Sequence, residues 1–313
     1  MTRRTVLAAG FGGAVAVASS GTAALAAAPS DAWRVVDAGT GKDLPWRDLP
    51  GRLTAGRAAN AIFVGELHDD PQTHLVERAL LEEVHKRVGD RLSLAMEMFE
   101  RDNQGALDEY LAGRTDEPAF AKAARLWRNY PTDYKPLVEY AKAKRVAVLA
   151  SNAPQPLVRR VGREGLAAVY SSLTDAERAT VAAYVTAPAD DEYARRFAKV
   201  MSGGGSAHGQ MDAAMIRRTY EAQCLRDDTM AETVARALDA GRVVFHVNGA
   251  FHSDAGLGTA ARVLWRRPLA ARLAVVKAIP VKGDVRKADP AADRPEADYL
   301  VYVPDQRPAP KET

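Results

Sequence analysis

The chain has little of several features that would decide its class at once. It holds a single cysteine, Cys224, among 313 residues, so no disulfide can form within one chain and the fold must depend on its hydrophobic core. The pattern around Cys224 is helical and places no base beside the thiol, which predicts a packed side chain rather than a nucleophile. Lysine and arginine outnumber aspartate and glutamate only by 43 to 40. This balance gives no basic field for nucleic acid, which we exclude as a partner.

Signatures of several enzyme classes are missing too. The sequence contains no P-loop and no dinucleotide-binding fingerprint. A serine hydrolase is not indicated, because the stretch Gly204-Gly205-Ser206-Ala207 lacks the second glycine of the nucleophile elbow. Aromatic residues are only 7% of the chain, so their concentration in residues 127–134 is a feature that needs an explanation.

Residues 1–28 are typical of an export signal. Arg3 and Arg4 precede an apolar run that extends to about Ala18, and small residues at 24–28 supply a cleavage site. This pattern resembles a twin-arginine signal, and an ordinary secretory leader with a chance arginine pair is the alternative. The run is shorter than the roughly 20 apolar residues that span a bilayer, so we expect no transmembrane segment. No cysteine stands at the cleavage point, so we expect an exported protein, periplasmic or secreted, that is not a lipoprotein.

The mature chain, residues 29–313, is expected to form a single α/β domain. With 47% hydrophobic residues it can bury a full core. A hairpin or edge strand is expected over residues 33–41. Nearly continuous apolar runs predict strands at 61–65, 91–98, 146–150, 243–248, 273–279 and 299–303. Helical patterns predict helices at 71–88, 103–112 and 258–265. This alternation favours a mostly parallel sheet with helices on both faces. Residues 156–238 are almost entirely helical in pattern, which predicts a helical insertion or cap between the third and fourth core strands.

The stretch from Ala61 to His74 joins the first core strand to the helix after it. Asp70 is placed to cap that helix and Pro71 to start it. The junction carries Glu66 and His68 as well as Asp69 and His74. Clustered carboxylates and imidazoles on a rigid turn suit a metal, cofactor or acid–base site, and a merely solvated polar loop is the alternative.

Polar side chains follow each of the four core strands where it ends. They are Glu66 and His68, then Glu97 with Arg101 a turn later, then Asn152, and finally Asn248 and His252. Ligands of open parallel sheets bind beyond the carboxyl ends of the strands, so these side chains should converge on one edge. Gly65-x-x-His68 and Gly249-x-x-His252 share one form, in which glycine permits a tight turn at the strand end. Two imidazoles with Glu66 and Glu97 predict a divalent transition-metal or general-base site.

These residues also match a family pattern. The matching motifs are the 61–74 stretch, Leu94-Ala95-Met96-Glu97-Met98-Phe99, Tyr134-x-Pro136-Leu137, Ser151-Asn152-Ala153-Pro154, Gln223-x-x-x-Asp227-x-x-Met230-Ala231 and Gly249-Ala250-Phe251-His252. In this order, from about Ile62 to Leu264, the chain resembles the ChaN-like proteins, the haem-binding uptake family of the Tiki superfamily. The resemblance implies an α/β core, export, haem binding tied to iron acquisition, and homodimers. The chain departs from the many ChaN lipoproteins because it lacks the lipobox cysteine.

The wider superfamily, which includes erythromycin esterases and Tiki metalloproteases, uses the paired histidines and a strand-end glutamate for hydrolysis. By that resemblance His68, Glu97 and His252 form the catalytic site here and serve as metal ligands. Glu66 and Arg101 are implied less directly. A metal-dependent or metal-free hydrolase is therefore the alternative to a haem-binding protein. A third possibility is an exported binding module that has kept the fold and lost the chemistry.

The haem iron ligand is left open between tyrosine and histidine. Tyr130 and Tyr134 lie in the aromatic segment with Arg128 and Lys135 nearby for the propionates. His208 follows a glycine run that composition marks as a mobile loop. Asn152, at the end of the third strand, is a further cofactor-binding candidate.

Tyr134 and a further ring, His246, also have purely structural interpretations. Tyr134 continues with Leu137, Val138 and Ala141 at helical spacing, which favours a core contact over an iron ligand. His246 lies inside an apolar strand and is expected to be a buried, hydrogen-bonded histidine.

Overall fold

The central strand, β3 (Ala61–Glu66), has an apolar side chain at each of its first four positions because both faces of the sheet are covered. The computed structural model describes residues 32–56, 59–203 and 212–307. Ile62 and Val64 pack into the core on one face, while Ala61 and Phe63 pack into a separate core on the other. Alternate residues of a strand point to opposite faces, so this strand contributes to both cores.

The sheet has eight strands in the order β2-β1-β8-β7-β3-β6-β4-β5. Besides β3, the strands are β1 (Arg34–Asp37), β2 (Lys42–Leu44), β4 (Leu92–Glu100), β5 (Ala147–Asn152), β6 (Val243–Gly249), β7 (Leu273–Val281) and β8 (Tyr299–Pro304). The strands from β8 to β5 pair in parallel, whereas β1 pairs antiparallel with both β2 and β8. The predicted α/β class with a mostly parallel sheet is confirmed, with an antiparallel edge at the predicted hairpin.

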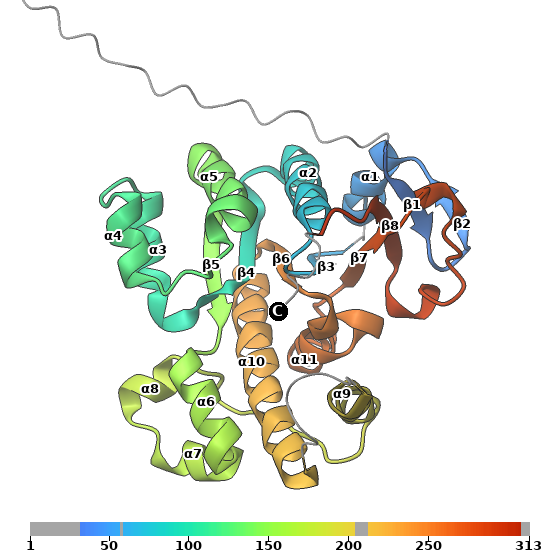
Figure 1. Cartoon of the computed structure of the whole chain (residues 1–313). Coiled ribbons are helices and arrows are strands. Elements are labelled where there is room, and N and C mark those ends of the chain that lie inside the picture. The colour runs from blue at the N-terminus through green and yellow to red at the C-terminus, as the bar shows by residue number, and fades with distance from the viewer. Residues whose placement is uncertain (1–31, 57–58, 204–211, 308–313) are drawn as a thin grey trace, which may run out of the picture.

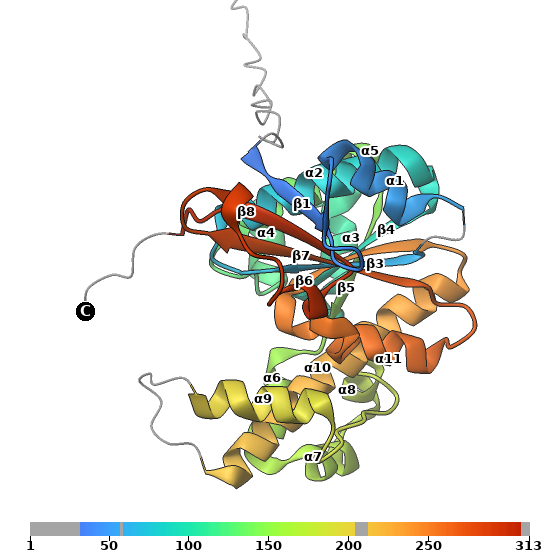
Figure 2. The same ribbon diagram turned by 90° about the vertical axis from the view of Figure 1, so that its right-hand side faces the viewer.

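Helices lie on both faces of the sheet (Figures 1 and 2). Those before β5 are α1 (Leu49–Thr54), α2 (Pro71–Val88), α3 (Gln104–Leu111), α4 (Glu117–Ala123) and α5 (Lys135–Lys144). Figure 2 shows α1, α2 and α5 on one side of the sheet, with α10 (Ala213–Asp239) and α11 (Gly258–Arg266) on the other. Asp70 caps α2 as predicted, since its side chain accepts hydrogen bonds from the backbone N–H groups of Gln72 and Thr73.

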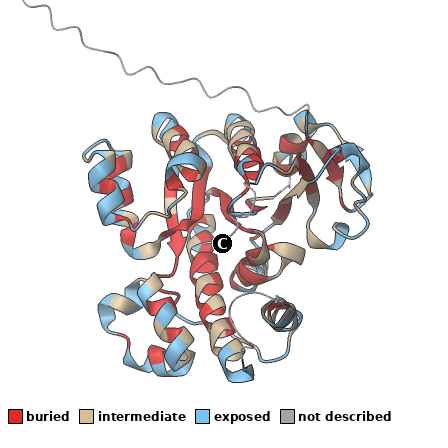
Figure 3. Cartoon of the chain, in the orientation of Figure 1, coloured by how far each residue is buried: buried red, intermediate tan, exposed pale blue. Residues whose placement is uncertain are grey.

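The chain between β5 and β6 is helical, as its pattern predicted. It forms α6 (Gln155–Glu164), α7 (Leu166–Ser172), α8 (Asp175–Ala179), α9 (Glu192–Gly203) and the long α10. Helix α10 packs against α6, α11 and β5, and so joins this helical lobe to the sheet. Figure 3 shows much of α10 buried between them, with exposed surface on the outer parts of α7 and α8.

Each of the four core strands runs past its predicted end, and the added residues include the predicted site residues Glu66 and Asn152. Strand β3 extends through Glu66, which pairs with Gly249 of β6, and β4 extends through Glu100. Parallel neighbours lengthen both strands, and an apolar pattern alone cannot detect this where the strand ends in polar residues.

Some expectations fall on residues that the structure does not describe. The export signal, 1–28, lies outside the described residues, so the division into a leader and a single domain at 29–313 stays a prediction. His208 lies outside them as well. Among the residues that the structure covers, none of the helices has the length and apolar character needed to cross a bilayer.

Candidate functional site

The carboxyl ends of the core strands bring the predicted side chains to one edge of the sheet. His68, Glu97, Asn152 and His252 line a single cavity of about 460 Å³ at this edge. The other side chains of the cavity wall are Glu100, Trp127, Gln155, Gln223 and Arg226. The wall combines one indole with many polar and charged groups, which suits a ligand that has both an aromatic face and charged substituents.

Glu97 reaches the cavity because β4 is irregular at this point. The pairing of β4 with β5 shifts register between Met96 and Glu100, and such an irregularity re-aims a side chain at a sheet edge. Asn152 stabilises the irregular backbone by donating to the Glu97 carbonyl at 2.9 Å. The Glu97 carboxylate in turn accepts a hydrogen bond of 2.8 Å from the Gly249 N–H.

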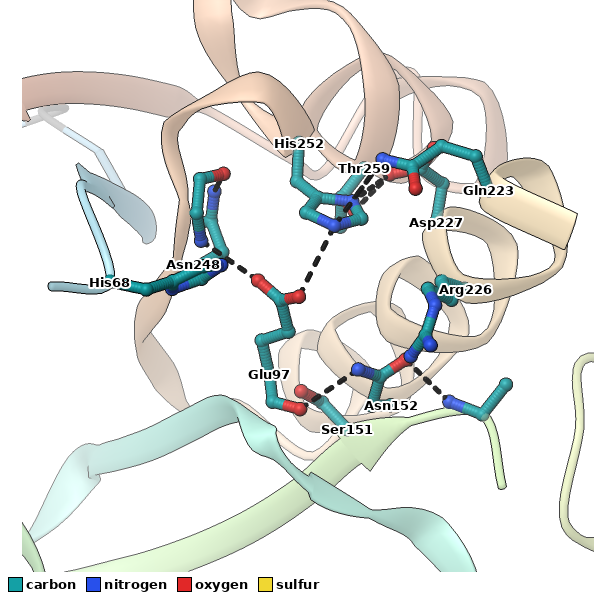
Figure 4. A network of polar contacts seen from close by, with 12 residues as sticks. His68, Glu97, Ser151, Asn152, Gln223, Arg226, Asp227, Asn248, His252 and Thr259 are labelled. Atoms are coloured by element: carbon teal, nitrogen blue, oxygen red, sulfur yellow. Dashed lines mark hydrogen bonds and ion pairs between the residues drawn. The ribbon is translucent and has the colours of Figure 1, made fainter. Parts of the chain in front are cut away.

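His252 lies between two carboxylates (Figure 4). Its Nε2 is 3.3 Å from Glu97 Oε1, and its Nδ1 is 2.7 Å from Asp227 Oδ1. Asp227 also accepts hydrogen bonds from Thr259 at 2.8 Å and from Tyr193 at 2.7 Å. Burial opposes the charged imidazolium, but the charges of Glu97 and Asp227 outweigh it and raise the pKa of His252 to about 10. Burial likewise opposes ionisation of Glu97, yet His252 and His68 hold the pKa of that carboxyl below its ordinary value.

His68 enters the cavity from the loop after β3. Its Nδ1 lies 2.6 Å from Glu66 Oε1, and its ring meets the Trp127 ring edge-on at 4.9 Å. Gly249 permits this approach, since a Cβ there would lie 2.7 Å from His68 Nε2. Burial lowers the pKa of His68, but the hydrogen bond to Glu66 and the charge of Glu97 raise it above the ordinary value overall.

A second carboxylate–imidazole cluster lies beneath His68. His74 Nδ1 is 2.8 Å from Glu66 Oε2 and 3.1 Å from Glu77 Oε2, and all three side chains are buried. Burial opposes each charge, but the two carboxylates raise the pKa of His74 to about 11. Contacts with His68 and His74 lower the pKa of Glu66 to about 2. Burial and the nearby Glu66 charge raise the pKa of Glu77 well above its ordinary value.

The predicted metal ligands, His68, Glu97 and His252, are not the residues whose ligand atoms lie closest together. Within the described part of the chain, only Glu66, His74 and Glu77 have ligand atoms that all lie within 4.8 Å of one another. His68 and His252 approach Glu97 from different sides in Figure 4. The three side chains predicted to share an ion do line one cavity, but they are spread around its wall.

Three other predicted residues lie away from the cavity wall. Arg101 points to α10, where it forms an ion pair of 3.0 Å with Glu232. Tyr134 is fully buried and donates a hydrogen bond of 2.8 Å to Glu66, so its interpretation as a core contact is confirmed. Tyr130 is also buried, and its hydroxyl has no hydrogen-bond partner among the described residues. The geometry therefore gives neither tyrosine hydroxyl access to the cavity, because packing directs both rings into the core.

His246 and Cys224 are structural, as predicted. His246 is fully buried on β6, with Nδ1 3.0 Å from Asn248 Oδ1. Burial lowers the pKa of His246 to about 4, so the ring is neutral. Cys224 is buried beside Arg262 on α11, and burial raises the pKa of its thiol to about 12.

Sequence reasoning missed the contribution of α10 to the cavity. Gln223 and Arg226 line it, and Asp227 holds His252 from behind. Gln223 and Asp227 are four residues apart and therefore lie on one helix face. That spacing was a usable signal, since both residues belong to one matching motif.

Comparisons with known proteins match the chain to a family and its fold to solved structures. The model of the family described as haem-binding uptake, Tiki superfamily, ChaN matches residues 53–263. A solved structure described as cofacial heme binding to ChaN of Campylobacter jejuni superposes with a TM-score of 0.63 at 14% identity, covering 86% of this chain and 96% of that one. An erythromycin esterase mutant, EreC, in its open conformation gives a TM-score of 0.49 at 10% identity, covering 90% of this chain and 100% of that one.

One curated relative also matches. The chloroplastic protein RETICULATA-RELATED 5 of Arabidopsis thaliana is 25% identical over 261 residues, which are 78% of this chain. The chain spans about a third of that relative, 34% of its length. Since the family model covers more than half of the sequence, the chain belongs to the ChaN-type haem-binding uptake family of the Tiki superfamily.

Proposed function

We propose that the protein is an exported haem-binding protein of iron uptake and that haem binds in the cavity at the sheet edge. The observation that carries this proposal is the state of the His68 ring. Glu66 fixes Nδ1, while no hydrogen bond from the described residues reaches Nε2. An imidazole with one nitrogen held by a carboxylate and the other free would be able to hold haem iron.

The cavity wall fits the rest of a haem group. Trp127 supplies an aromatic surface beside His68, and Arg226 supplies positive charge for a propionate. The volume, about 460 Å³, is within the range of roughly 300–1,000 Å³ found for ligand pockets. Bound haem would supply the iron that His68 coordinates, so the ligand assigned from the geometry is His68 rather than Tyr130 or Tyr134.

Export and dimer formation complete the proposal. The twin-arginine pattern of residues 1–28 supports delivery of the mature protein across the membrane. The name of the Campylobacter jejuni structure refers to cofacial haem, and a pair of stacked haems needs two binding sites. We therefore propose that haem loading is accompanied by homodimer formation, which light scattering with and without haemin would measure.

A haemin titration of residues 29–313, followed by absorbance, tests the haem site. We expect a saturable shift of the haem band in the wild type, and in His68→Ala a Kd at least about tenfold weaker with a displaced band. His85→Ala is the matched control, because this histidine lies on α2 and contacts Tyr140 instead of the cavity. An unchanged Kd and band in His68→Ala would refute His68 as the ligand. Binding no tighter than to an unrelated protein would refute the haem proposal itself.

A hydrolase is the second candidate, because of one specific arrangement. Asp227 holds Nδ1 of His252, and Nε2 faces Glu97 at the cavity wall. A carboxylate-oriented imidazole beside a second carboxylate is suited to general acid–base work. A screen of ester and amide substrates, repeated with His252→Gln, tests it: turnover in the wild type that the substitution abolishes supports the hydrolase, and turnover that is equal in both proteins excludes this arrangement as its source.

A further inference from the structure

The buried cluster of Glu66, His74 and Glu77 is separate from the cavity wall and has no role in the proposed haem site beyond the hydrogen bond of Glu66 to His68. His74 and Glu77 lie three residues apart on α2, so both point from the same helix face. Glu66 reaches them from the end of β3. We propose that these three side chains form a binding site for one divalent transition-metal ion, with Zn²⁺ as its best match.

The distances already approach those of a metal site. With ligand bonds of about 2.0–2.1 Å, the edges of a tetrahedral zinc site are roughly 3.3–3.4 Å long. His74 Nδ1 lies 2.8 Å from Glu66 Oε2 and 3.1 Å from Glu77 Oε2. An ion would need these atoms to separate by only a few tenths of an ångström, which side-chain torsions on fixed elements can provide.

The cluster also has more acceptors than donors. The single N–H available at His74 Nδ1 can serve one carboxylate, and it bonds Glu77 Oε2. Glu66 Oε2 then has only its contact of 2.8 Å with the same Nδ1, and Glu77 Oε1 has no hydrogen-bond partner among the described residues, although both side chains are fully buried. Unpaired buried carboxylate oxygens cost free energy. A cation between the three side chains removes that cost, because it gives each carboxylate an interaction.

The second ring nitrogen of His74 has the kind of partners that metal-bound histidines usually have on the nitrogen that does not bind the metal. Its other nitrogen, Nε2, lies 3.3 Å from the His68 carbonyl and 3.5 Å from Asp133 Oδ2. A carbonyl or carboxylate behind the ring fixes the tautomer that leaves Nδ1 as the ligand atom. This arrangement is independent of the oxygens that face Nδ1.

Charge selects the class of ion. With the ion bound, two ionised carboxylates and a neutral imidazole would carry a charge of −2, and a divalent cation would make the buried group neutral in place of the protons that the ligands release. One nitrogen ligand favours a first-row transition ion over Mg²⁺ or Ca²⁺, which prefer oxygen ligands alone. The ion would position His68 indirectly, because Glu66 uses its second oxygen, Oε1, for His68 and Tyr134.

Metal retention by the purified mature protein tests the proposal. After incubation with Zn²⁺ and desalting, we expect about one equivalent in the wild type and less than about a tenth in His74→Gln and Glu77→Gln. The matched controls on the same helix are His85→Gln and Glu83→Gln, which should retain the full equivalent because His85 contacts Tyr140 and Glu83 contacts Lys86. Less than a tenth of an equivalent in the wild type, or equal retention in His74→Gln, would overturn the site.

Two further measurements keep the test decisive. If His74→Gln does not fold, wild-type protein is first stripped of metal with a chelator and then titrated with Co²⁺. We expect the absorption bands of cobalt in a low-symmetry site, and these bands should saturate at one Co²⁺ per chain. A featureless titration would overturn the proposal. His68→Ala separates the two sites: it should lose the haem band and keep the zinc equivalent. Loss of zinc together with haem would instead place the ion at the cavity wall.

Discussion

Two histidines of this protein each lie between two carboxylates, and they differ in what surrounds them. At the cavity wall, His252 lies between Glu97 and Asp227. The oxygens of these carboxylates have other donors, namely a backbone N–H for Glu97 and two hydroxyls for Asp227. The imidazolium there is a fully satisfied part of the structure that still faces a cavity.

Behind His68, His74 lies between Glu66 and Glu77 and is not part of that cavity's wall, and Glu77 Oε1 has no hydrogen-bond partner among the described residues. The two carboxylate–imidazole–carboxylate clusters therefore differ in whether every carboxylate oxygen has a hydrogen-bond partner. A satisfied cluster beside a cavity can hold and move a proton or face a ligand, whereas a buried cluster with an unpaired carboxylate oxygen has a ligand atom to offer to the metal ion that we propose there. His68 connects the two, because it bonds Glu66 and approaches Gly249 at the cavity. The following predictions break one cluster at a time.

Gly258→Ala should have the largest effect, because it destroys the packing behind His252. Gly258 has φ +52°, and a Cβ there would lie 2.5 Å from the His252 carbonyl oxygen. We expect the free energy of unfolding to fall by roughly 3 kcal/mol or more. Gly256→Ala is the control, with φ +67° and nothing within 4 Å, so it should cost only about 1 kcal/mol of backbone strain. Urea unfolding measures both; equal losses would show that the contact with His252 is unimportant.

The pH dependence of stability should be the next largest effect. Since the pKa of His252 is raised to about 10, well above the roughly 6.5 of an unfolded histidine, the folded protein binds an additional proton between these values. The stability from this group is complete below about pH 6.5 and falls as the pH rises toward 10. Between pH 7 and pH 8.5 the wild type should lose about 2 kcal/mol more than His252→Gln. Urea unfolding at both pH values checks this, and parallel losses in the two proteins would contradict it.

Gly249→Ala tests the close approach that joins the two clusters. The new Cβ would lie 2.7 Å from His68 Nε2, so the ring must leave its position over Gly249. We expect haemin to bind about tenfold more weakly, which is about 1.4 kcal/mol, while zinc retention is unchanged. Gly105→Ala on α3, where nothing lies within 4 Å, should leave haemin binding as it is. Equal haemin affinities in the two variants would mean that the position of His68 is not required.

The smallest effect concerns two buried tyrosines. Tyr134→Phe removes a hydrogen bond to Glu66 and should lower the free energy of unfolding by about 1 kcal/mol. Tyr130→Phe removes a hydroxyl without a partner among the described residues and should leave stability unchanged or slightly higher. The haem band should be the same in both. A band lost in Tyr134→Phe alone would restore that tyrosine as the iron ligand.

The sequence was sufficient for the framework because its signals are local. The apolar run of β3, the cap at Asp70 and the order of strands and helices are set by neighbours in the chain, and all formed as predicted. The convergence of Glu97, His68 and His252 on one edge was also predictable. It requires only that parallel strands end on the same side.

Only the tertiary structure decided what each polar side chain does there. Nothing in the local pattern indicated that Arg101 would turn to Glu232, or that Asp227 of a distant helix would hold His252. The sequence already grouped His74 with Glu66 and His68 in a cluster suited to a metal, cofactor or acid–base site, but only the fold placed it between Glu66 and the buried Glu77. The physical reason is that the charge and ligand capacity of a side chain depend on burial and on the partners within a few ångströms, and these come from segments that are far apart in the chain.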